Sequence, residues 1–259
     1  MTEVELSLVL PAFDCVPYIG TSVRRALGYF EEHGIQGEVV VADDGSTDGT
    51  ADAVPAAPNV RVLRLQHRGK GGALRAGMTA ADGRIRAFTD ADLPYGLEPL
   101  ERASRLIAAS GAHAVIGDRT LPGSEYRSTP VRRALSGFAG LAFRTLVVGE
   151  IRDTQCGFKC FRGDVAVELF RLARVDGFAI DIEVLFLLLR YGLDVQRIPV
   201  RLEGDSLSSV QVLRDSIRAA RDVVAIRLGW TRGRYRSTVL PGIATQGPPG
   251  PTSPRDRPG

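Results

Sequence analysis

The sequence predicts an α/β fold in which helices flank one central, mostly parallel sheet, and three observations support this prediction. Strand and helix patterns alternate over the first 120 residues, as they do in chains that build parallel sheets. The chain has 259 residues, 44% of them hydrophobic and 24% charged, so it is long enough to bury a large core. Acidic residues cluster directly after the expected strands, at the sheet edge where ligands bind in such folds.

The first half contains five expected strands and three expected helices. The strands are short apolar runs at Leu6–Leu10, Glu38–Ala42, Val60–Leu65, Arg84–Thr89 and His113–Gly117. The first helix is expected to begin at Thr21 or Ser22, since both residue types cap helices well, and to bury Val23, Ala26, Leu27 and Phe30. Further helices are expected at Gly69–Ala81, which glycines open, and at Leu97–Ala109.

The second half is less regular. Helices are expected at Val131–Val148, Asp164–Ala173, Ile180–Tyr191 and Val212–Trp230, with a loop and short strand at Thr154–Phe161 and a strand at Val195–Val200. The helix at Val212–Trp230 is basic and amphipathic, and its expected apolar side comprises Val212, Leu213, Ile217, Ala220, Val224 and Leu228. Residues 237–259 are expected to form a disordered tail, because most of this segment is rich in Pro, Gly and Ser.

Charge and hydropathy disfavour several classes of protein. The net charge is +3, and residues 211–236 alone hold seven arginines and two aspartates. A nucleic-acid binder with a basic face spread over its whole fold is therefore disfavoured, and we expect no nucleic-acid partner. No apolar run reaches the roughly 18–20 residues of a transmembrane helix. We also expect no signal peptide, because the N-terminus is acidic and leads directly into a strand.

The cysteines point to a reducing compartment. Cys15, Cys156 and Cys160 are too few for a disulfide framework, and their spacing lacks the further ligands of a zinc site. We interpret them as reduced structural thiols, which predicts a cytoplasmic protein.

Asp90-Ala-Asp92 follows the strand that ends at Thr89. In an extended chain, side chains at i and i+2 point the same way, so both carboxylates could share one divalent cation. Mg²⁺ and similar hard cations prefer carboxylate oxygens together with substrate phosphates. The alternative is a pair of solvated loop carboxylates.

Two further motifs lie at the same predicted edge of the sheet. Asp43 and Asp44 end the second strand, where they could bind a base or ribose, cap the following turn, or do both. Arg68-Gly-Lys-Gly-Gly72 opens a helix and could bind a phosphate through backbone amides and Lys70. A plain capped helix start explains this second motif nearly as well.

Taken together, these motifs resemble those of glycosyltransferase family 2, and in particular its dolichyl/polyprenyl-phosphate sugar synthases of the glucosyltransferase-like branch. The resemblance covers about residues 6–230. The motifs that carry it are Leu8–Asp14, Val39–Thr50, Arg68–Gly77, Phe88–Leu93, Ile116–Arg119, Asp153–Lys159 and Asp176–Glu183.

The resemblance implies the GT-A fold over residues 1–236, with a nucleotide-sugar half (1–120) and an acceptor half (121–236). It implies an inverting hexosyltransferase that uses a UDP-sugar, with glucose or N-acetylglucosamine as the sugar. Asp90 and Asp92 would hold Mg²⁺ or Mn²⁺, the only cofactor implied. The other donor-binding residues would be Pro11, Ala12, Asp14, Asp43, Asp44, Lys70 and Ala91.

The resemblance also implies an acceptor site. Arg119, helped by Arg132 or Arg133, would meet the phosphate of a polyprenyl or dolichyl phosphate. Asp153 and Asp181 are candidates for a positioning or base role, and Asp92 is counted with them as catalytic. The structural alternatives are that Asp153 bonds its own turn and that Asp181 caps a helix.

Three departures from the family pattern keep other functions open. The first motif reads Pro-Ala-Phe-Asp-Cys where the family has Pro-Ala-Tyr-Asn-Glu. Residues 204–210 lack the usual late lysine, and no membrane helix follows. The alternatives are a soluble small-molecule acceptor and a catalytically weak nucleotide-sugar-binding protein. Basic helices could also place the protein at the inner face of a membrane, and a homodimer is left open.

Overall fold

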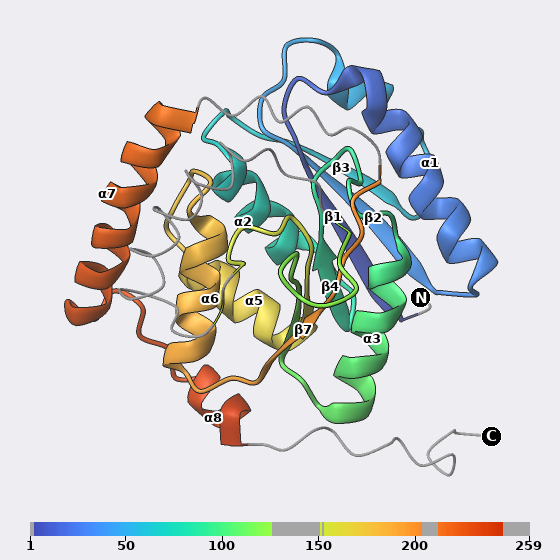
Figure 1. Cartoon of the computed structure of the whole chain (residues 1–259). Coiled ribbons are helices and arrows are strands. Elements are labelled where there is room, and N and C mark those ends of the chain that lie inside the picture. Colours follow the sequence, from blue (N-terminus) through green and yellow to red (C-terminus); the bar gives the residue numbers. More distant parts are fainter. Residues whose placement is uncertain (1–2, 126–150, 152, 204–211, 246–259) are drawn as a thin grey trace.

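The protein is built on one seven-stranded sheet flanked by helices (Figure 1). The structure is a computed structural model that describes residues 3–125, 151, 153–203 and 212–245, without side chains at 212–217, 219 and 220. The strand order is β3-β2-β1-β4-β6-β5-β7. Only β6 runs antiparallel to its neighbours β4 and β5, and the other pairings are parallel. The predicted mostly parallel sheet is therefore confirmed.

The strands fall close to their predicted positions. They are β1 (Leu6–Ala12), β2 (Gly37–Asp43), β3 (Val60–Arg64), β4 (Ile85–Phe88), β5 (Ala114–Gly117), β6 (Lys159–Arg162) and β7 (Val195–Ile198). The helices are α1 (Val16–Glu32), a short 3₁₀ turn η1 (Thr50–Ala53), α2 (Lys70–Ala80), α3 (Glu98–Ser110), α5 (Gly163–Leu172), α6 (Ile180–Arg190), α7 (Val212–Thr231) and α8 (Leu240–Thr245).

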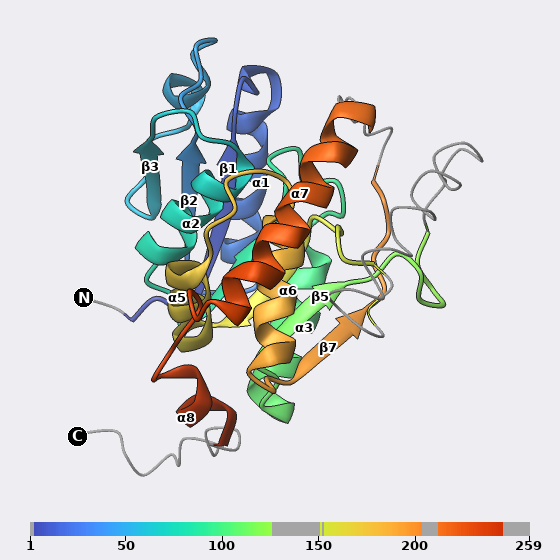
Figure 2. The ribbon, with the colours of Figure 1, turned by 90° about the vertical axis from the view of Figure 1, so that its left-hand side faces the viewer.

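The alternation of side chains along the central strands creates two cores. On β1, Leu8 and Leu10 face the core shared with α1 and α3, whereas Val9 faces the core shared with α2, α5 and α6. Both faces of the sheet are thus covered by helices, as Figure 2 shows from the side. The central strands are buried on both faces, which explains why β1 and β2 read as nearly continuous apolar runs.

Helix α1 begins five residues before the predicted cap. Pro17 lies in its first turn, and the amide of Val16 donates to Oδ2 of Asp48 at 3.0 Å. Thr21 and Ser22 therefore lie inside the helix. The local capping pattern misled because the residue that satisfies the helix start lies 32 positions away in the sequence.

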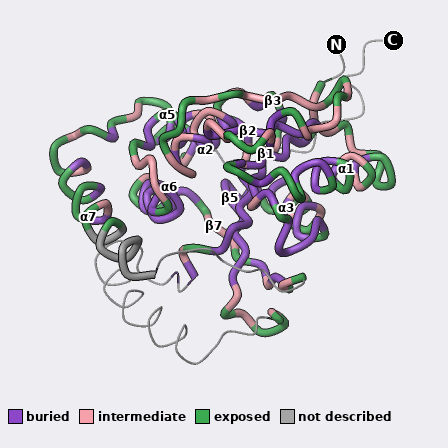
Figure 3. Tube along the Cα trace, turned by 90° about the horizontal axis from the view of Figure 1, so that it is seen from above, coloured by how far each residue is buried: buried purple, intermediate pink, exposed green. Residues whose placement is uncertain are grey.

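The predicted apolar side of helix α7 is not the side that the helix buries. Val223 and Ile226 are buried, whereas Val224 and Leu228, which belong to the predicted apolar side, are 56% and 45% exposed. The helix packs on α6 through Trp230, whose ring meets the ring of Phe186 edge-on. The outer face of α7 is green in Figure 3.

The expected disorder from residue 237 is wrong for residues 237–245. The hydroxyl of Ser237 donates to Glu168 at 2.5 Å and accepts from the amides of Val239 and Leu240, so it caps α8. Leu240 and Ile243 are then buried in the same core as α5.

Several predictions concern segments outside the described residues: the helix at Val131–Val148, the motif at 204–210 that lacks the late lysine, and the tail at 246–259. Among the described helices, none is both long and apolar enough to cross a membrane.

Candidate active site

The predicted site residues gather at one edge of the sheet. Strands β2 and β4 both run parallel to β1, so their carboxyl ends meet at the same side. Pro11 and Ala12 end β1, Asp43 ends β2, and Asp90 and Ala91 follow β4. The sequence therefore predicted which chain ends come together, and the side-chain contacts show what each acid does there.

Asp44 is occupied by the protein itself. Its carboxylate is 4% exposed and accepts hydrogen bonds from the amides of Arg68 at 2.9 Å and Gly69 at 2.7 Å. Nδ1 of His67 lies 2.9 Å from the same carboxylate. Asp44 thus ties the end of β2 to the loop that opens α2, a structural role different from the predicted cap of the turn after β2.

Asp43 and Asp14 brace the neighbouring turn. Oδ1 of Asp43 accepts from both the amide and the hydroxyl of Ser46. The amide of Asp14 donates to the same hydroxyl, and Oδ1 of Asp14 accepts from the amide of Thr47 at 2.9 Å. Asp14 has a φ of +46°, a conformation that Asp tolerates better than most residues. Asp14 is exposed beside this turn, so its predicted contact with the nucleotide remains a prediction.

The glycines of Arg68–Gly72 serve close packing. The carbonyl of Asp176 accepts from the amides of Gly71 at 2.7 Å and Gly72 at 3.4 Å. A Cβ at Gly69 or Gly71 would lie 2.5 or 2.1 Å from the backbone of the 175–176 loop. Most of these amides are therefore already satisfied, and a phosphate contact would depend on Lys70 rather than on a bare helix N-terminus.

The chain turns at Asp90 and Asp92 instead of remaining extended. The amide of Leu93 donates to the carbonyl of Asp90 at 2.9 Å, and Leu93 itself has a φ of +49°. The i and i+2 geometry that we expected is therefore wrong. Asp90 is nevertheless half-buried and Asp92 exposed, and both lie just after β4. Partial desolvation and the charge of Asp90 raise the pKa of Asp92, so the two carboxylates lie close enough to repel.

This pair fits a hard divalent cation. Two neighbouring carboxylates that repel one another are stabilised when a cation binds between them, and Mg²⁺ or Mn²⁺ completes its coordination with water and substrate phosphates. Within the described residues, no group of three or more His, Cys, Asp or Glu side chains could form a closed metal site. An ion at Asp90 and Asp92 would therefore need ligands from the substrate.

Two lysines and two aspartates alternate in a row that begins with Asp90. Nζ of Lys70 lies 2.7 Å from Oδ1 of Asp90 and 3.6 Å from Oδ2 of Asp181. Nζ of Lys159 donates to Oδ1 of Asp181 at 2.5 Å and to the carbonyl of Cys156 at 2.8 Å. These are the only two lysines of the chain. Asp181 therefore does not cap α6 but links the two ammonium groups.

The pKa values of Lys70 and Asp90 fit this row. Burial opposes the charged form of Lys70, but Asp90 and Asp181 outweigh it and raise the pKa of its ammonium above the ordinary value. Burial likewise opposes the charged form of Asp90, and Lys70 outweighs it and lowers the pKa of this carboxyl. Both groups are thus charged at neutral pH.

The Asp153–Lys159 motif, which leads into β6, supports this region. A Cβ at Gly157 would lie 2.1 Å from Oδ2 of Asp90, so only glycine lets that carboxylate sit where it does. Lys159 is fully buried despite its charge. Neither residue received a role from the sequence alone. A lysine inside the apolar stretch Phe158–Phe161 was the signal, because such a side chain needs a buried carboxylate partner.

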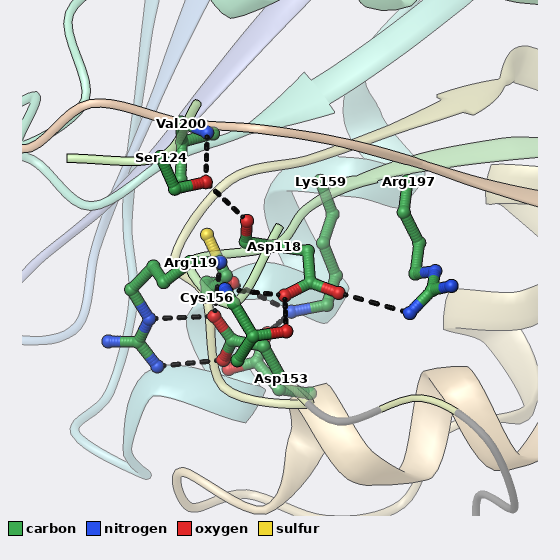
Figure 4. A network of polar contacts seen from close by, with 10 residues as sticks. Asp118, Arg119, Ser124, Asp153, Cys156, Lys159, Arg197 and Val200 are labelled. Atoms are coloured by element: carbon green, nitrogen blue, oxygen red, sulfur yellow. Dashed lines mark hydrogen bonds and ion pairs between the residues drawn. The ribbon is translucent and has the colours of Figure 1, made fainter. Parts of the chain in front are cut away.

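Arg119 is held by Asp153 (Figure 4). Two guanidinium nitrogens donate to the two carboxylate oxygens at 2.7 and 2.8 Å, and the Arg119 amide donates at 2.9 Å. Burial raises the pKa of Asp153, but Arg119 outweighs it and the net shift is downward. This ion pair replaces the expected bond of Asp153 to its own turn and makes Asp153 a weak base. Arg132 and Arg133 lie outside the described residues.

Glu183 is a further residue for which no role was predicted from the sequence. It is fully buried and accepts from the amides of Arg174 and Val175 and from the hydroxyl of Tyr235 at 2.5 Å. Burial raises the pKa of this carboxyl. Glu183 fixes the loop whose next residue, Asp176, holds the start of α2.

The chain is similar to known proteins over most of its length. The family model described as "Glycosyl transferase family 2" matches residues 7–169, more than half of the chain. The dolichyl-phosphate beta-glucosyltransferases of Saccharomyces cerevisiae and Drosophila melanogaster are 29% and 30% identical to it. Both alignments cover 90% of this chain, and they cover 77% and 78% of those proteins respectively.

Two solved structures share the fold. Mannosyl-3-phosphoglycerate synthase from Rubrobacter xylanophilus has a TM-score of 0.66 and 18% identity, covering 91% of this chain and 77% of that one. Glucosyl-3-phosphoglycerate synthase from Mycobacterium tuberculosis, solved with Mn²⁺, UDP and glucosyl-3-phosphoglycerate, has a TM-score of 0.60 and 22% identity, covering 87% and 79%. The predicted GT-A fold is thereby confirmed.

Proposed function

The chain belongs to glycosyl transferase family 2 and is a glycosyltransferase, and we propose that it transfers glucose from UDP-glucose to a polyprenyl or dolichyl phosphate. The sugar and the acceptor are suggested by the relatives named above, which align with 90% of this chain. The nucleotide is suggested by the resemblance and by the UDP in a structural neighbour.

One observation carries the proposal: an acidic pair lies beside fixed cations at the carboxyl edge of the sheet. Nζ of Lys70 lies 2.7 Å from Asp90, and the charges of Lys70, Lys159 and Arg119 all lower the pKa of this carboxyl. Such an arrangement suits a reaction in which a diphosphate leaves and a second phosphate attacks, because both substrates are anionic there.

The residues of the chain have separate roles in this reaction. Asp90 and Asp92 would hold Mg²⁺ or Mn²⁺, which when bound neutralises the charge of the leaving diphosphate. Arg119, held rigidly by Asp153, would orient the acceptor phosphate. An oxygen of that phosphate forms a bond to C1 of glucose while the bond from C1 to the UDP oxygen breaks and UDP takes the electron pair. A single displacement inverts the anomeric centre and gives a β-linked product.

No general base is needed for a phosphate acceptor. Its oxygen is already ionised at neutral pH, so there is no proton to remove. This agrees with Asp153 and Asp181, both of which are tied up in ion pairs. We therefore assign both a positioning role.

The outer face of α7 would bring the enzyme to its lipid substrate. Val224 and Leu228 are exposed there beside exposed Arg221 and Arg227. Apolar side chains interleaved with arginines are typical of helices that bind anionic membrane surfaces. We infer a peripheral contact with the cytoplasmic face of a membrane. The division into a donor half (1–120) and an acceptor half (121–236), and a homodimer, stay predictions.

A soluble phosphorylated acceptor is the second candidate. It is favoured by the two structural neighbours, whose names give 3-phosphoglycerate products.

The test is transfer of radiolabelled glucose from UDP-glucose, with Mn²⁺, to polyprenyl phosphate in vesicles or to 3-phosphoglycerate. We expect label in the lipid fraction, and none with Asp92→Asn. Label found only in 3-phosphoglycerate would refute the lipid acceptor and support a soluble one. Binding of UDP-glucose without any turnover would favour the nucleotide-sugar-binding protein.

Flotation with phosphatidylglycerol vesicles tests the membrane contact. A Val224→Ser/Leu228→Ser variant should lose binding, whereas Val239→Ser, which changes an equally exposed valine elsewhere, should not. Wild-type protein that fails to float would refute the contact.

A further inference from the structure

We propose that the ammonium group of Lys70 neutralises Asp90 while no metal is bound, and that it moves to Asp181 when a divalent cation binds. This inference rests on the proposed function, because it takes Asp90 as a ligand of that cation. Lys70, Asp181 and Lys159 then act together, since they adapt the charge of the donor site to the presence or absence of the metal.

Lys70 lies between two carboxylates. Its Nζ is in direct contact with Asp90 at 2.7 Å, while Oδ2 of Asp181 lies at 3.6 Å. A displacement of about 1 Å would convert the longer distance into a hydrogen bond. The side chain of Lys70 is only 13% exposed, so water offers little alternative when it leaves Asp90.

Asp181 is available to receive this ammonium. Its Oδ1 is taken by Lys159, whose ammonium is also fixed by the carbonyl of Cys156. Oδ2 is the oxygen that faces Lys70. Lys159 is fully buried and Asp181 is 4% exposed, so this pair is a rigid part of the interior. Asp181 can therefore receive a second ammonium without moving.

Charge repulsion supplies the driving force for the movement. A buried ammonium cannot stay 2.7 Å from a carboxylate that takes a divalent cation without strong repulsion between the two cations. Moving Lys70 to Asp181 lowers this repulsion and leaves each carboxylate with a positive partner. Without metal, Lys70 keeps Asp90 neutralised, so the half-buried carboxylate is never left without a counter-charge.

The chain offers an unusually clean test, because it has only two lysines. Full-length protein labelled with ¹³C at lysine Cε should give two lysine signals, and Lys70→Met assigns them by removing one. On titration with diamagnetic Mg²⁺ we expect the Lys70 signal to move to a saturating end point. The Lys159 signal should move much less.

A binding measurement complements the spectra. Free Mn²⁺ is followed by its electron paramagnetic resonance signal in the absence of nucleotide. Lys70→Met should raise the Mn²⁺ affinity about tenfold, because the competing charge is gone. Arg68→Met, which removes the same charge from an exposed neighbour in the same loop, should change it less than about twofold since that charge is screened. Asp181→Asn removes the receiving carboxylate and should weaken Mn²⁺ binding.

The outcomes separate the two proposals. If Mn²⁺ binds and Asp92→Asn abolishes binding, but the Lys70 signal does not respond to Mg²⁺, the proposed movement of Lys70 is refuted while the proposed metal site is supported. The movement of Lys70 is also refuted if Arg68→Met raises the Mn²⁺ affinity as much as Lys70→Met does. If wild-type protein binds no Mn²⁺, or if the Asp92→Asn variant binds it equally well, both the metal site and the movement of Lys70 are refuted.

Discussion

Two acidic pairs lie at the carboxyl ends of strands β2 and β4, at the same edge of the sheet, and their side chains have different kinds of partner. Asp43 ends β2 and Asp44 follows it, and the carboxylates of both accept hydrogen bonds from backbone amides. Asp90 and Asp92 come after β4. Asp90 meets a lysine side chain, and Asp92 is exposed. In the sequence the two motifs look alike, since each is a pair of acids directly after an apolar strand.

The role of each acid depends on whether its carboxylate is bound by a backbone amide or by a side chain. A backbone amide cannot leave without breaking the local fold, so an acid bound to one acts as a brace. A lysine side chain can swing away, and an exposed carboxylate has only water to lose. The pair after β4 can therefore exchange partners during a reaction, whereas Asp44 cannot.

Loss of an acid from the open pair should have the largest effect. Asp92→Asn is expected to reduce glucosyl transfer by about a thousandfold, because the charge on the leaving diphosphate is no longer neutralised. Its free energy of unfolding should stay within about 0.5 kcal/mol of wild type, as for other exposed sites. Activity assays and urea titration measure the two effects. If Asp92→Asn were inactive because it unfolds, Asp92 would have a structural role, and the contrast with Asp43 and Asp44 would be refuted.

Asp153 is an intermediate case, since its partner is a side chain but the pair is buried. Asp153→Asn should cost about 3 kcal/mol of stability at pH 7, because Arg119 keeps a largely buried charge without its partner. The folded state lowers the pKa of Asp153 below its ordinary 3.8, so its contribution is complete above about pH 4.

The cost of Asp153→Asn should therefore shrink as the pH falls below about 4, because the unfolded chain then binds a proton at Asp153 that the folded state takes up only at lower pH. Urea titrations at pH 7 and pH 3 measure this. Glu125→Gln breaks a pair with Arg201 in which both side chains are more than 60% exposed, so its cost should stay below about 1 kcal/mol. A pH-independent cost at Asp153 would contradict the assignment.

Gly157 tests whether the position of Asp90 matters. In Gly157→Ala the new methyl group must push the Asp90 carboxylate away, and a shift of about 1 Å should lower activity about a hundredfold. Gly28→Ala is the matched control, because a Cβ there meets nothing within 4 Å. Equal activities of the two variants would show that Asp90 tolerates displacement.

The brace should show the smallest effect of the four, and in stability rather than chemistry. Asp44→Ala leaves the amides of Arg68 and Gly69 without an acceptor and should cost about 2 kcal/mol. Asp52→Ala, which removes an exposed acid paired with exposed Arg64, should cost less than about 0.5 kcal/mol. Urea titration compares them, and equal costs would mean that Asp44 is no brace.

The sequence predicted the strands well because apolar runs buried on both faces leave little choice. It failed where a distant residue completes a local pattern. Asp48 satisfies the start of α1 from 32 positions away, and Asp176 takes the amides of a loop that reads as a phosphate site. On helix α7, Val224 and Leu228 of the predicted apolar side are exposed, and Val223 and Ile226 are buried where Trp230 packs against α6.

The candidate site was predicted as a set of residues but not as a set of contacts. Asp90, Asp92, Lys70, Arg119, Asp153 and Asp181 all belong to the motifs of the sequence. Which acid pairs with which cation depends on how β4, β6 and α6 pack, and a single sequence does not contain that information.

The most direct test is Mn²⁺ binding by the full-length protein, followed by electron paramagnetic resonance. The contrast between the two pairs predicts that wild type binds Mn²⁺, that Asp92→Asn does not, and that Asp44→Ala still does at a temperature where it is folded. Loss of binding in Asp44→Ala with retention in Asp92→Asn would reverse the two roles and contradict the account.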